Sequence, residues 1–192
     1  MKTLSPLAVA ATLLAAAASL AQAEAVTYAV EPMHTYVTFE VRHFGTSTNR
    51  GRFDKKEGSI TLDRAAKTGR ADITIDTASI SSGLPMFDGH LRGDNFLRVK
   101  DFPTAKFVGN QFTFDGDKVS AVSGTLTLLG KTQPITLNAT NFNCYDSPML
   151  KREVCGGDFE ATLQRSAYGM TYGLPGIPDS VKLVIQIEAV RQ

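Results

Sequence analysis

The chain has 192 residues, with 20 Lys and Arg against 19 Asp and Glu, so its formal net charge at pH 7 is +1. A chain of this length suits one domain with a single hydrophobic core. The near-neutral charge offers no general attraction to nucleic acid or to an anionic membrane, which argues against proteins that bind their partners through a strongly basic surface.

The first 23 residues have the features of a secretory signal peptide. Lys2 supplies a positive start, residues 4–20 form an apolar run rich in Ala and Leu, and residues 21–23 have the small-x-small pattern of a cleavage site. We therefore predict export and cleavage after Ala23, which leaves one mature domain of residues 24–192. No second apolar run is long enough to span a bilayer, so we expect no stable membrane insertion of the mature chain.

Short segments in which apolar and polar residues alternate make up most of the mature chain. Alternation with period 2 is typical of strands that bury one face. It predicts strands at residues 28–30, 34–43, 51–62, 69–80, 105–114, 118–143, 158–166 and 181–190, with a bend or bulge at Gly58. Pro32 ends the first of them, and the Gly- and Pro-rich residues 169–178 are expected to form a loop.

The alternation is interrupted between residues 83 and 102. Met86, Phe87, Leu91 and Phe96 are spaced there as on one or two short helical turns, and prolines lie near both ends of the segment. We expect a helical segment that covers one end of the sheet or lies across a mouth.

Residues 118–143 have the pattern of an antiparallel hairpin, with a turn within residues 129–134. Leu126 and Leu128 share one face before the turn, and Ile135 and Leu137 share one face after it. Thr residues at the alternate positions suit a half-buried strand.

The two cysteines, Cys144 and Cys155, allow one intrachain pairing. An exported protein meets an oxidising environment, and neither a CxxC motif nor a cluster of histidines suggests a redox or metal site. We therefore predict a structural disulfide that closes the loop between them.

Many short antiparallel strands separated by turn signals indicate a sandwich or a barrel, and periodicity alone does not distinguish the two. A barrel of about eight strands has an interior that side chains can fill or that can hold one small ligand. The residues expected to face this interior are apolar. They are Val37, Phe39, Val41, Phe53, Ile60, Ile73, Ile75, Phe107, Leu126, Leu128, Ile135, Leu137, Phe159, Leu163, Leu183 and Ile185.

Extending the same alternation to the ends of the strands places three polar side chains on the inner face, His43, Asn141 and Arg165. They are candidates for binding a ligand head group at a mouth. The chain contains no common hydrolase, zinc-protease or nucleotide-binding motif and only three histidines, so we expect no catalytic residues, no metal and no cofactor.

A series of short motifs resembles the YceI-like family of bacterial polyisoprenoid-binding proteins. The motifs are His34, His43-Phe44-Gly45, Gly51-Arg52-Phe53 with Gly58, His90-Leu91-Arg92, Asn95-Phe96-Leu97, Phe102-Pro103 with Phe107, Gly124-Thr125-Leu126 with Gly130 and Pro134, and the strand of residues 180–190. The resemblance covers essentially the whole mature chain. It implies an all-β, lipocalin-like antiparallel barrel whose lumen holds a long isoprenoid chain, usually in the periplasm.

The preferred interpretation is a periplasmic protein that carries or sequesters an isoprenoid lipid, such as a prenyl quinone or prenyl diphosphate. The alternative is a periplasmic stress or interaction protein whose barrel is packed and free of ligand. An isoprenoid-processing enzyme is less favoured, because the chain lacks a catalytic set. A homodimer and a membrane-protein partner both remain compatible with the sequence.

Overall fold

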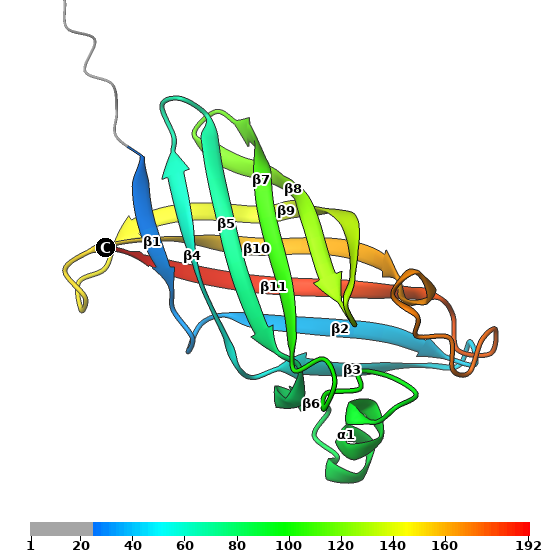
Figure 1. Ribbon diagram of the computed structural model, residues 1–192. Helices are drawn as coiled ribbons and strands as arrows, with labels where there is room; N and C mark the ends of the chain where they lie inside the picture. Colours follow the sequence, from blue (N-terminus) through cyan, green and yellow to red (C-terminus); the bar gives the residue numbers. More distant parts are fainter. Residues whose placement is uncertain (1–24) are drawn as a thin grey trace, which may run out of the picture.

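The computed structural model describes residues 25–192, so the predicted signal peptide lies outside the described residues. The described chain forms antiparallel strands, one α-helix and two short 3-10 helices (Figure 1). The strands are β1 (Val26–Val30), β2 (Tyr36–His43), β3 (Ser47–Phe53), β4 (Lys56–Asp63), β5 (Thr68–Asp76), β6 (Ile80–Ser81), β7 (Thr104–Asp115), β8 (Lys118–Leu128), β9 (Lys131–Asp146), β10 (Glu153–Gln164) and β11 (Ser180–Arg191). The helices are η1 (Thr77–Ser79), α1 (Pro85–Arg92) and η2 (Arg165–Tyr168).

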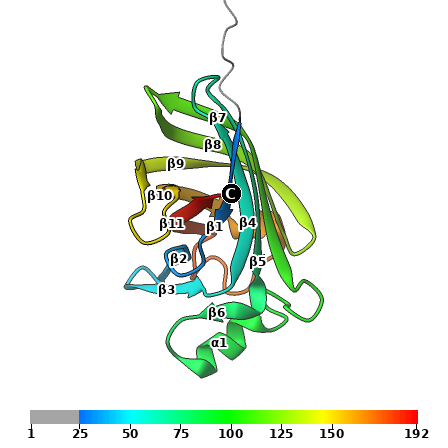
Figure 2. The same cartoon turned by 90° about the vertical axis from the view of Figure 1, so that its left-hand side faces the viewer.

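Eight of these strands close into a barrel. The hydrogen-bonded order is β1, β4, β5, β7, β8, β9, β10 and β11, and β11 pairs with β1 to complete the ring. Seen from the end that carries the C-terminus, the strands curve around a common interior (Figure 2). The remaining strands, β2, β3 and β6, extend the sheet from the other part of β11. The prediction of an antiparallel barrel of about eight strands with one short helical segment is confirmed.

The predicted hairpin of residues 118–143 is formed by β8 and β9. The two residues between the strands, Leu129 and Gly130, have φ angles of 51° and 71°. Positive φ at both central positions matches the right-handed twist of the flanking strands, which is why two-residue hairpin loops favour this conformation. The turn fixes the register so that Leu126 and Leu128 point to the interior.

The single strand predicted for residues 51–62 is wrong in extent, because the chain leaves the sheet after Phe53 and re-enters it at Lys56. β3 pairs with β2 and β6, whereas β4 pairs with β1 and β5. The break therefore moves the chain from the extension back to the barrel. Local alternation cannot reveal such a change of pairing partners, because both halves keep the same period.

The strands β1 and β2 lie one after the other along the same edge of β11. Thr35 joins them: its Oγ1 donates to the Glu188 carbonyl oxygen at 3.2 Å and accepts the Glu188 amide at 3.1 Å. The side chain thus replaces the backbone pairing that the connection between the strands interrupts, and it is almost fully buried.

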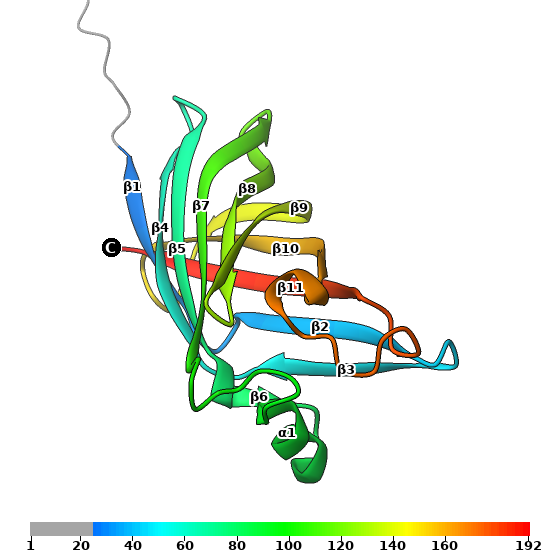
Figure 3. The ribbon, with the colours of Figure 1, turned by 45° about the vertical axis from the view of Figure 1, so that its right-hand side comes forward.

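The α1 segment leaves the sheet after β6 and is tied to it at both ends. Thr77 donates its Oγ1 to the Phe102 carbonyl and its amide to the Pro103 carbonyl. Arg92 donates to the carbonyls of Ala78 and Ile80, and Asp88 accepts hydrogen bonds from the amide and the hydroxyl of Ser82. These bonds hold the helix firmly against one end of the molecule, as Figure 3 shows. Within residues 25–192, no helix is long and apolar enough to cross a membrane.

Candidate functional site: an apolar tunnel with one mouth

The barrel interior contains two adjoining cavities. The larger has a volume of about 640 Å³ and the smaller about 110 Å³. Four residues line both cavities and mark the place where the two meet: Val37, Ile75, Leu126 and Leu183. The two cavities therefore adjoin within one apolar interior, which we call the tunnel below.

All sixteen residues expected to face the interior line the tunnel. Those that line only the larger cavity are Phe39, Val41, Phe53, Leu128 and Leu163. Those that line only the smaller cavity are Ile60, Ile73, Phe107, Ile135, Leu137, Phe159 and Ile185. The other four, Val37, Ile75, Leu126 and Leu183, line both cavities. The alternation of each strand is thus sufficient to place its side chains, because the barrel keeps one face of every strand inside.

The tunnel opens at the end where α1, the β2–β3 turn and residues 169–178 come together (Figure 3). Four lining residues of the larger cavity are exposed to solvent and form the mouth, namely His43, Phe44, His90 and Tyr172. The rings of His90 and Tyr172 meet edge to face, with centroids 5.7 Å apart. Both also pack against Phe96. The mouth therefore combines aromatic surface with the hydrogen-bonding atoms of imidazole and phenol groups.

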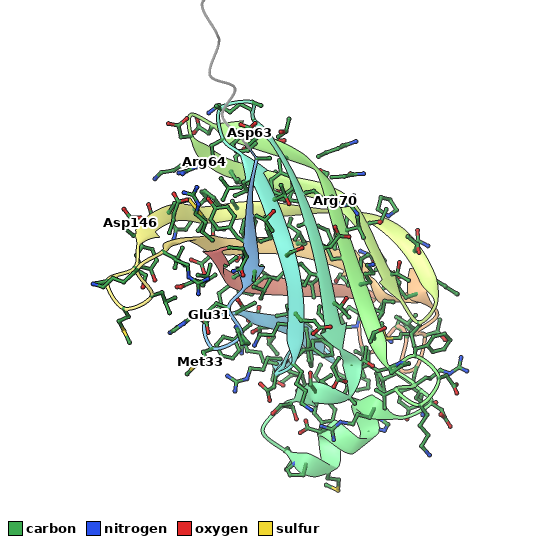
Figure 4. All side chains as sticks on the ribbon, turned by 60° about the vertical axis from the view of Figure 1, so that its left-hand side comes forward. Glu31, Met33, Asp63, Arg64, Arg70 and Asp146 are labelled. Atoms are coloured by element: carbon green, nitrogen blue, oxygen red, sulfur yellow. A yellow bond between two sulfur atoms is a disulfide. The ribbon has the colours of Figure 1, made fainter. Side chains whose placement is uncertain are left out.

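The residues that line the smaller cavity are all buried or half-buried. Tyr28 lines it and donates its Oη to Glu153 Oε2 at 2.6 Å, while Arg64 Nη2 binds the other carboxylate oxygen at 2.6 Å. Burial, together with the hydrogen bond to the Glu153 carboxylate, raises the pKa of Tyr28 to about 12. Figure 4, which brings this side of the molecule forward, shows Arg64 and Asp146 at the strand ends around it.

His43 is the one head-group candidate with a free position at the mouth. It ends β2, and the alternation that turns Val37, Phe39 and Val41 inward also turns His43 toward the larger cavity. Its ring meets Phe44 edge to face, with centroids 4.8 Å apart.

Arg165 also borders the larger cavity, but its guanidinium is occupied by the protein itself. It is 3% exposed. It donates to four backbone carbonyls at 2.8–2.9 Å: those of Met170, Tyr172, Ile177 and Pro178. Because burial disfavours its charged form, the pKa of Arg165 is lowered, with the nearby Asp179 opposing that effect. Arg165 therefore holds residues 169–178 in place at the mouth rather than presenting free donors to a head group.

The prediction that Asn141 faces the interior is wrong. The pairing of β9 with β10 shifts between Asp158 and Phe159, so that Thr140 is an extra residue in β9. A bulge of this kind reverses the alternation beyond it. Phe142 consequently lines the smaller cavity, while Asn141 is exposed on the outside.

The predicted disulfide between Cys144 and Cys155 is confirmed, with an S–S distance of 2.07 Å. The two residues are direct partners in the β9–β10 ladder, so both strands continue past the disulfide and only residues 147–152 form the loop. Cys155 lines the smaller cavity. Among the described residues, these cysteines and Glu153 are the one group with the spacing of a metal site, and both sulfur atoms are consumed in the disulfide.

The lining residues that come from outside the strands do not follow from the alternation. They are Phe44, Phe87, His90, Phe96, Met170, Tyr172 and Ile177, together with smaller contributions from their neighbours. Asn49 of β3 also lines the larger cavity and was not expected to do so. The helical spacing of Phe87, His90 and Leu91 was a usable signal, because residues three and four apart share one face.

Comparison with known proteins, by family model and by relatives, points to one family. The model of the YceI-like domain family matches residues 28–189. The UPF0312 protein of Pseudomonas aeruginosa strain LESB58 is 32% identical over 194 residues, which cover 100% of this chain and 98% of the relative.

Solved structures share the fold. Burkholderia cenocepacia BcnA aligns with a TM-score of 0.69 at 23% identity and covers 83% of this chain and 99% of its own. A polyisoprenoid binding domain from Saccharophagus degradans aligns with a TM-score of 0.63 at 16% identity, over 87% of this chain and 99% of its own. Since the family model spans most of the chain and a relative matches along its whole length, this protein belongs to the YceI-like domain family.

Proposed function

We propose that this protein binds one long isoprenoid chain in the tunnel and carries or sequesters it after export to the periplasm. The observation that carries the proposal is the apolar interior of the barrel, where the larger cavity reaches the mouth and the adjoining smaller cavity reaches Tyr28. A barrel with a packed interior, the alternative considered from the sequence, would not leave a cavity of about 640 Å³.

The length of the tunnel favours a chain longer than an ordinary acyl chain. Alternate residues of β11 line it from Val181 at the mouth side to Ala189 in the smaller cavity. At a rise of about 3.3 Å per residue, this eight-residue separation corresponds to about 26 Å along the strand. Because strands in a closed barrel are tilted by about 40°, the depth of the tunnel is about 20 Å. This depth exceeds the roughly 15 Å of hydrocarbon that one leaflet of a bilayer, and hence one acyl chain, spans. A long isoprenoid chain would fill it.

A relative supports this ligand class. The domain from Saccharophagus degradans, which shares the fold, is described as a polyisoprenoid binding domain. The predicted signal peptide supports export, which would place the protein near the membranes that contain such lipids.

The mouth suits a polar head group. His43, His90 and Tyr172 offer hydrogen-bonding atoms and aromatic faces at the point where a chain enters. These hydrogen-bonding atoms suit a head group rich in acceptor oxygens, such as a diphosphate or a quinone. We infer binding rather than catalysis, because the deeper wall is apolar and the one sulfur pair that reaches it is a disulfide.

The decisive experiment is to purify the exported protein from its native compartment, extract it with organic solvent and identify the extract by mass spectrometry. We expect about one isoprenoid molecule per protein. An Ile75→Trp variant, whose larger ring blocks the junction of the two cavities, is the matched control and should lose most of this lipid while keeping its fold by circular dichroism. A wild-type protein that yields no apolar molecule, and that binds no added prenol, would contradict the proposal.

A further inference from the structure

The rim of the tunnel mouth carries a concentration of exposed apolar side chains. Five of the nine large hydrophobic residues that are exposed within residues 25–192 lie in the three segments around the mouth. We call them the mouth patch: Phe44, Leu84, Met86, Tyr172 and Leu174. Met86 is 81% exposed and Phe44 65%. Exposed apolar side chains that gather around one end of a protein are typical of an interaction site.

The mouth patch is held in a defined shape. Phe44 has a φ of 47°, a conformation that is unfavourable for a bulky residue and that is more often retained at functional positions. Its ring packs directly over Gly176, where a Cβ atom would lie 2.4 Å from Phe44 Cε1. Arg165 fixes the loop that carries Gly176, Tyr172 and Leu174. The side chains and the loop of the mouth patch are therefore already ordered before binding, which avoids the entropy cost of ordering them.

The charges around the patch identify the kind of partner. Residues 169–178 contain no charged side chain. Arg42, near the end of β2, and Lys131, at the start of β9, are exposed and have no carboxylate partner among the described residues. Lys131 lies beside Gly169, its Nζ 3.2 Å from where a Cβ would be.

The acidic groups of the surrounding segments are largely neutralised by their neighbours. Glu40 pairs with Arg50, and Asp101 pairs with Arg98. Asp88 and Asp179 accept hydrogen bonds from serines, Ser82 and Ser166 respectively. Within the described chain, only Asp94 among the acids of these segments has neither type of partner. The mouth end thus presents aromatic and aliphatic groups bordered by free cations.

We propose that the mouth patch docks on the surface of a phospholipid bilayer that contains anionic lipids. Apolar and aromatic side chains bordered by Lys and Arg are the combination that binds a membrane interface. This inference rests on the proposed function, since docking would let an isoprenoid chain pass between bilayer and tunnel without crossing water. The mouth patch is continuous with the tunnel, because Phe44 and Tyr172 belong to both.

The opposite end of the barrel supplies a matched control. Met149 and Leu150 are also exposed there, in the loop between β9 and β10. The loop between β9 and β10 lies at the opposite end of the molecule from the β2–β3 turn and residues 169–178 (Figure 1). No lining residue of the tunnel is exposed at that end.

The test uses the mature protein and vesicles of phosphatidylcholine with or without phosphatidylglycerol, separated by flotation. The test variant is Leu84→Ser/Met86→Ser/Leu174→Ser, whose positions do not line the tunnel. We expect at least a tenfold weaker binding to anionic vesicles for this variant and no change for the control, Met149→Ser/Leu150→Ser. Arg42→Gln/Lys131→Gln should lose the preference for anionic vesicles.

Binding of a fluorescent prenol in vesicle-free solution is measured in parallel. This measurement distinguishes a failure of the docking proposal from a failure of the proposed isoprenoid binding. If the wild type binds the prenol but does not float with vesicles, or if the triple variant floats as well as the wild type, the docking proposal is wrong. If the mouth patch docks on a membrane protein instead of lipid, the wild type will not bind protein-free vesicles. That result would also contradict the docking proposal. If flotation depends on the mouth patch but the protein binds no prenol, the docking proposal is supported and the proposed isoprenoid binding is contradicted.

Discussion

At the scale of single residues, the polar groups near the tunnel have two different tasks. His43, His90 and Tyr172 lie at the mouth with atoms free for a ligand, whereas Arg165 and Tyr28 have their polar atoms bound by the protein. Arg165 illustrates why the residue type alone does not define a site. An arginine near an apolar cavity suggests a receptor for anions, yet here its donors satisfy carbonyls that the loop would otherwise bury unpaired.

Tyr28 makes a prediction about alkaline stability. The ordinary pKa of a tyrosine is 10.0, and in the fold it is raised to about 12. The folded protein therefore keeps the phenolic proton at pH values where the unfolded chain loses it. The corresponding contribution to the free energy of unfolding is fully present below pH 10 and is lost between pH 10 and pH 12, by about 3 kcal/mol in total.

We expect Tyr28→Phe to remove this part of the pH dependence, which urea denaturation across that window would measure. The variant retains the Arg64 contact with Glu153, so the carboxylate is not left unpaired. Parallel loss of stability in the wild type and the variant would show that another group is responsible.

At the scale of elements, closure of the barrel depends on features that interrupt regular strands. The extra residue at Thr140 changes the direction of side chains in β9, and Thr35 bridges the connection between β1 and β2. Gly124 lets β8 approach β7 closely, since a Cβ there would lie 2.0 Å from the Val108 carbonyl oxygen. Such irregularities bend strands and so allow a sheet to close.

The disulfide joins two of these elements and should stabilise them. Cys144 and Cys155 are 11 positions apart, and closing a loop of that size stabilises the folded state by about 3 kcal/mol through the lost entropy of the unfolded chain. We expect Cys144→Ala/Cys155→Ala to lower the free energy of unfolding by about that amount. Denaturation with and without a reducing agent measures it: reduction should weaken the wild type and leave the double variant unaffected. An unchanged midpoint of the wild type on reduction would contradict the prediction.

At the scale of the whole molecule, the barrel surrounds an apolar interior with a mouth at one end. The mouth is assembled from the β2–β3 turn, α1 and residues 169–178, while the smaller cavity reaches the disulfide. For a ligand that enters at the mouth, the depth of the tunnel should determine the longest chain that can be fully buried, and each additional buried methylene contributes about 0.8 kcal/mol.

Tryptophan substitutions along the β8–β9 hairpin would test this relation. Leu126 lies at the junction of the cavities and Leu137 only in the smaller one. We expect Leu126→Trp to bind only short prenols, and Leu137→Trp to lose affinity only for the longest. Titration with prenols of increasing length, monitored by ligand fluorescence, gives the limiting length for each variant. The same limiting length in both variants would show that the chain does not follow the tunnel.

The sequence by itself determined which face of each strand is apolar, and with it all sixteen predicted lining residues, the hairpin of β8 and β9 and the disulfide. Alternation within an uninterrupted strand is a local property and two cysteines allow one pairing, so these features hold in the folded chain. Only the tertiary structure decided that β3 and β4 have different partners, that Asn141 faces outward and that Arg165 holds a loop. The tertiary structure also decided where the mouth lies. His43, His90 and Tyr172 come from segments far apart in the chain, and they line the same cavity only after folding. Contacts between such segments depend on how the ring of strands closes, which no single stretch of sequence specifies.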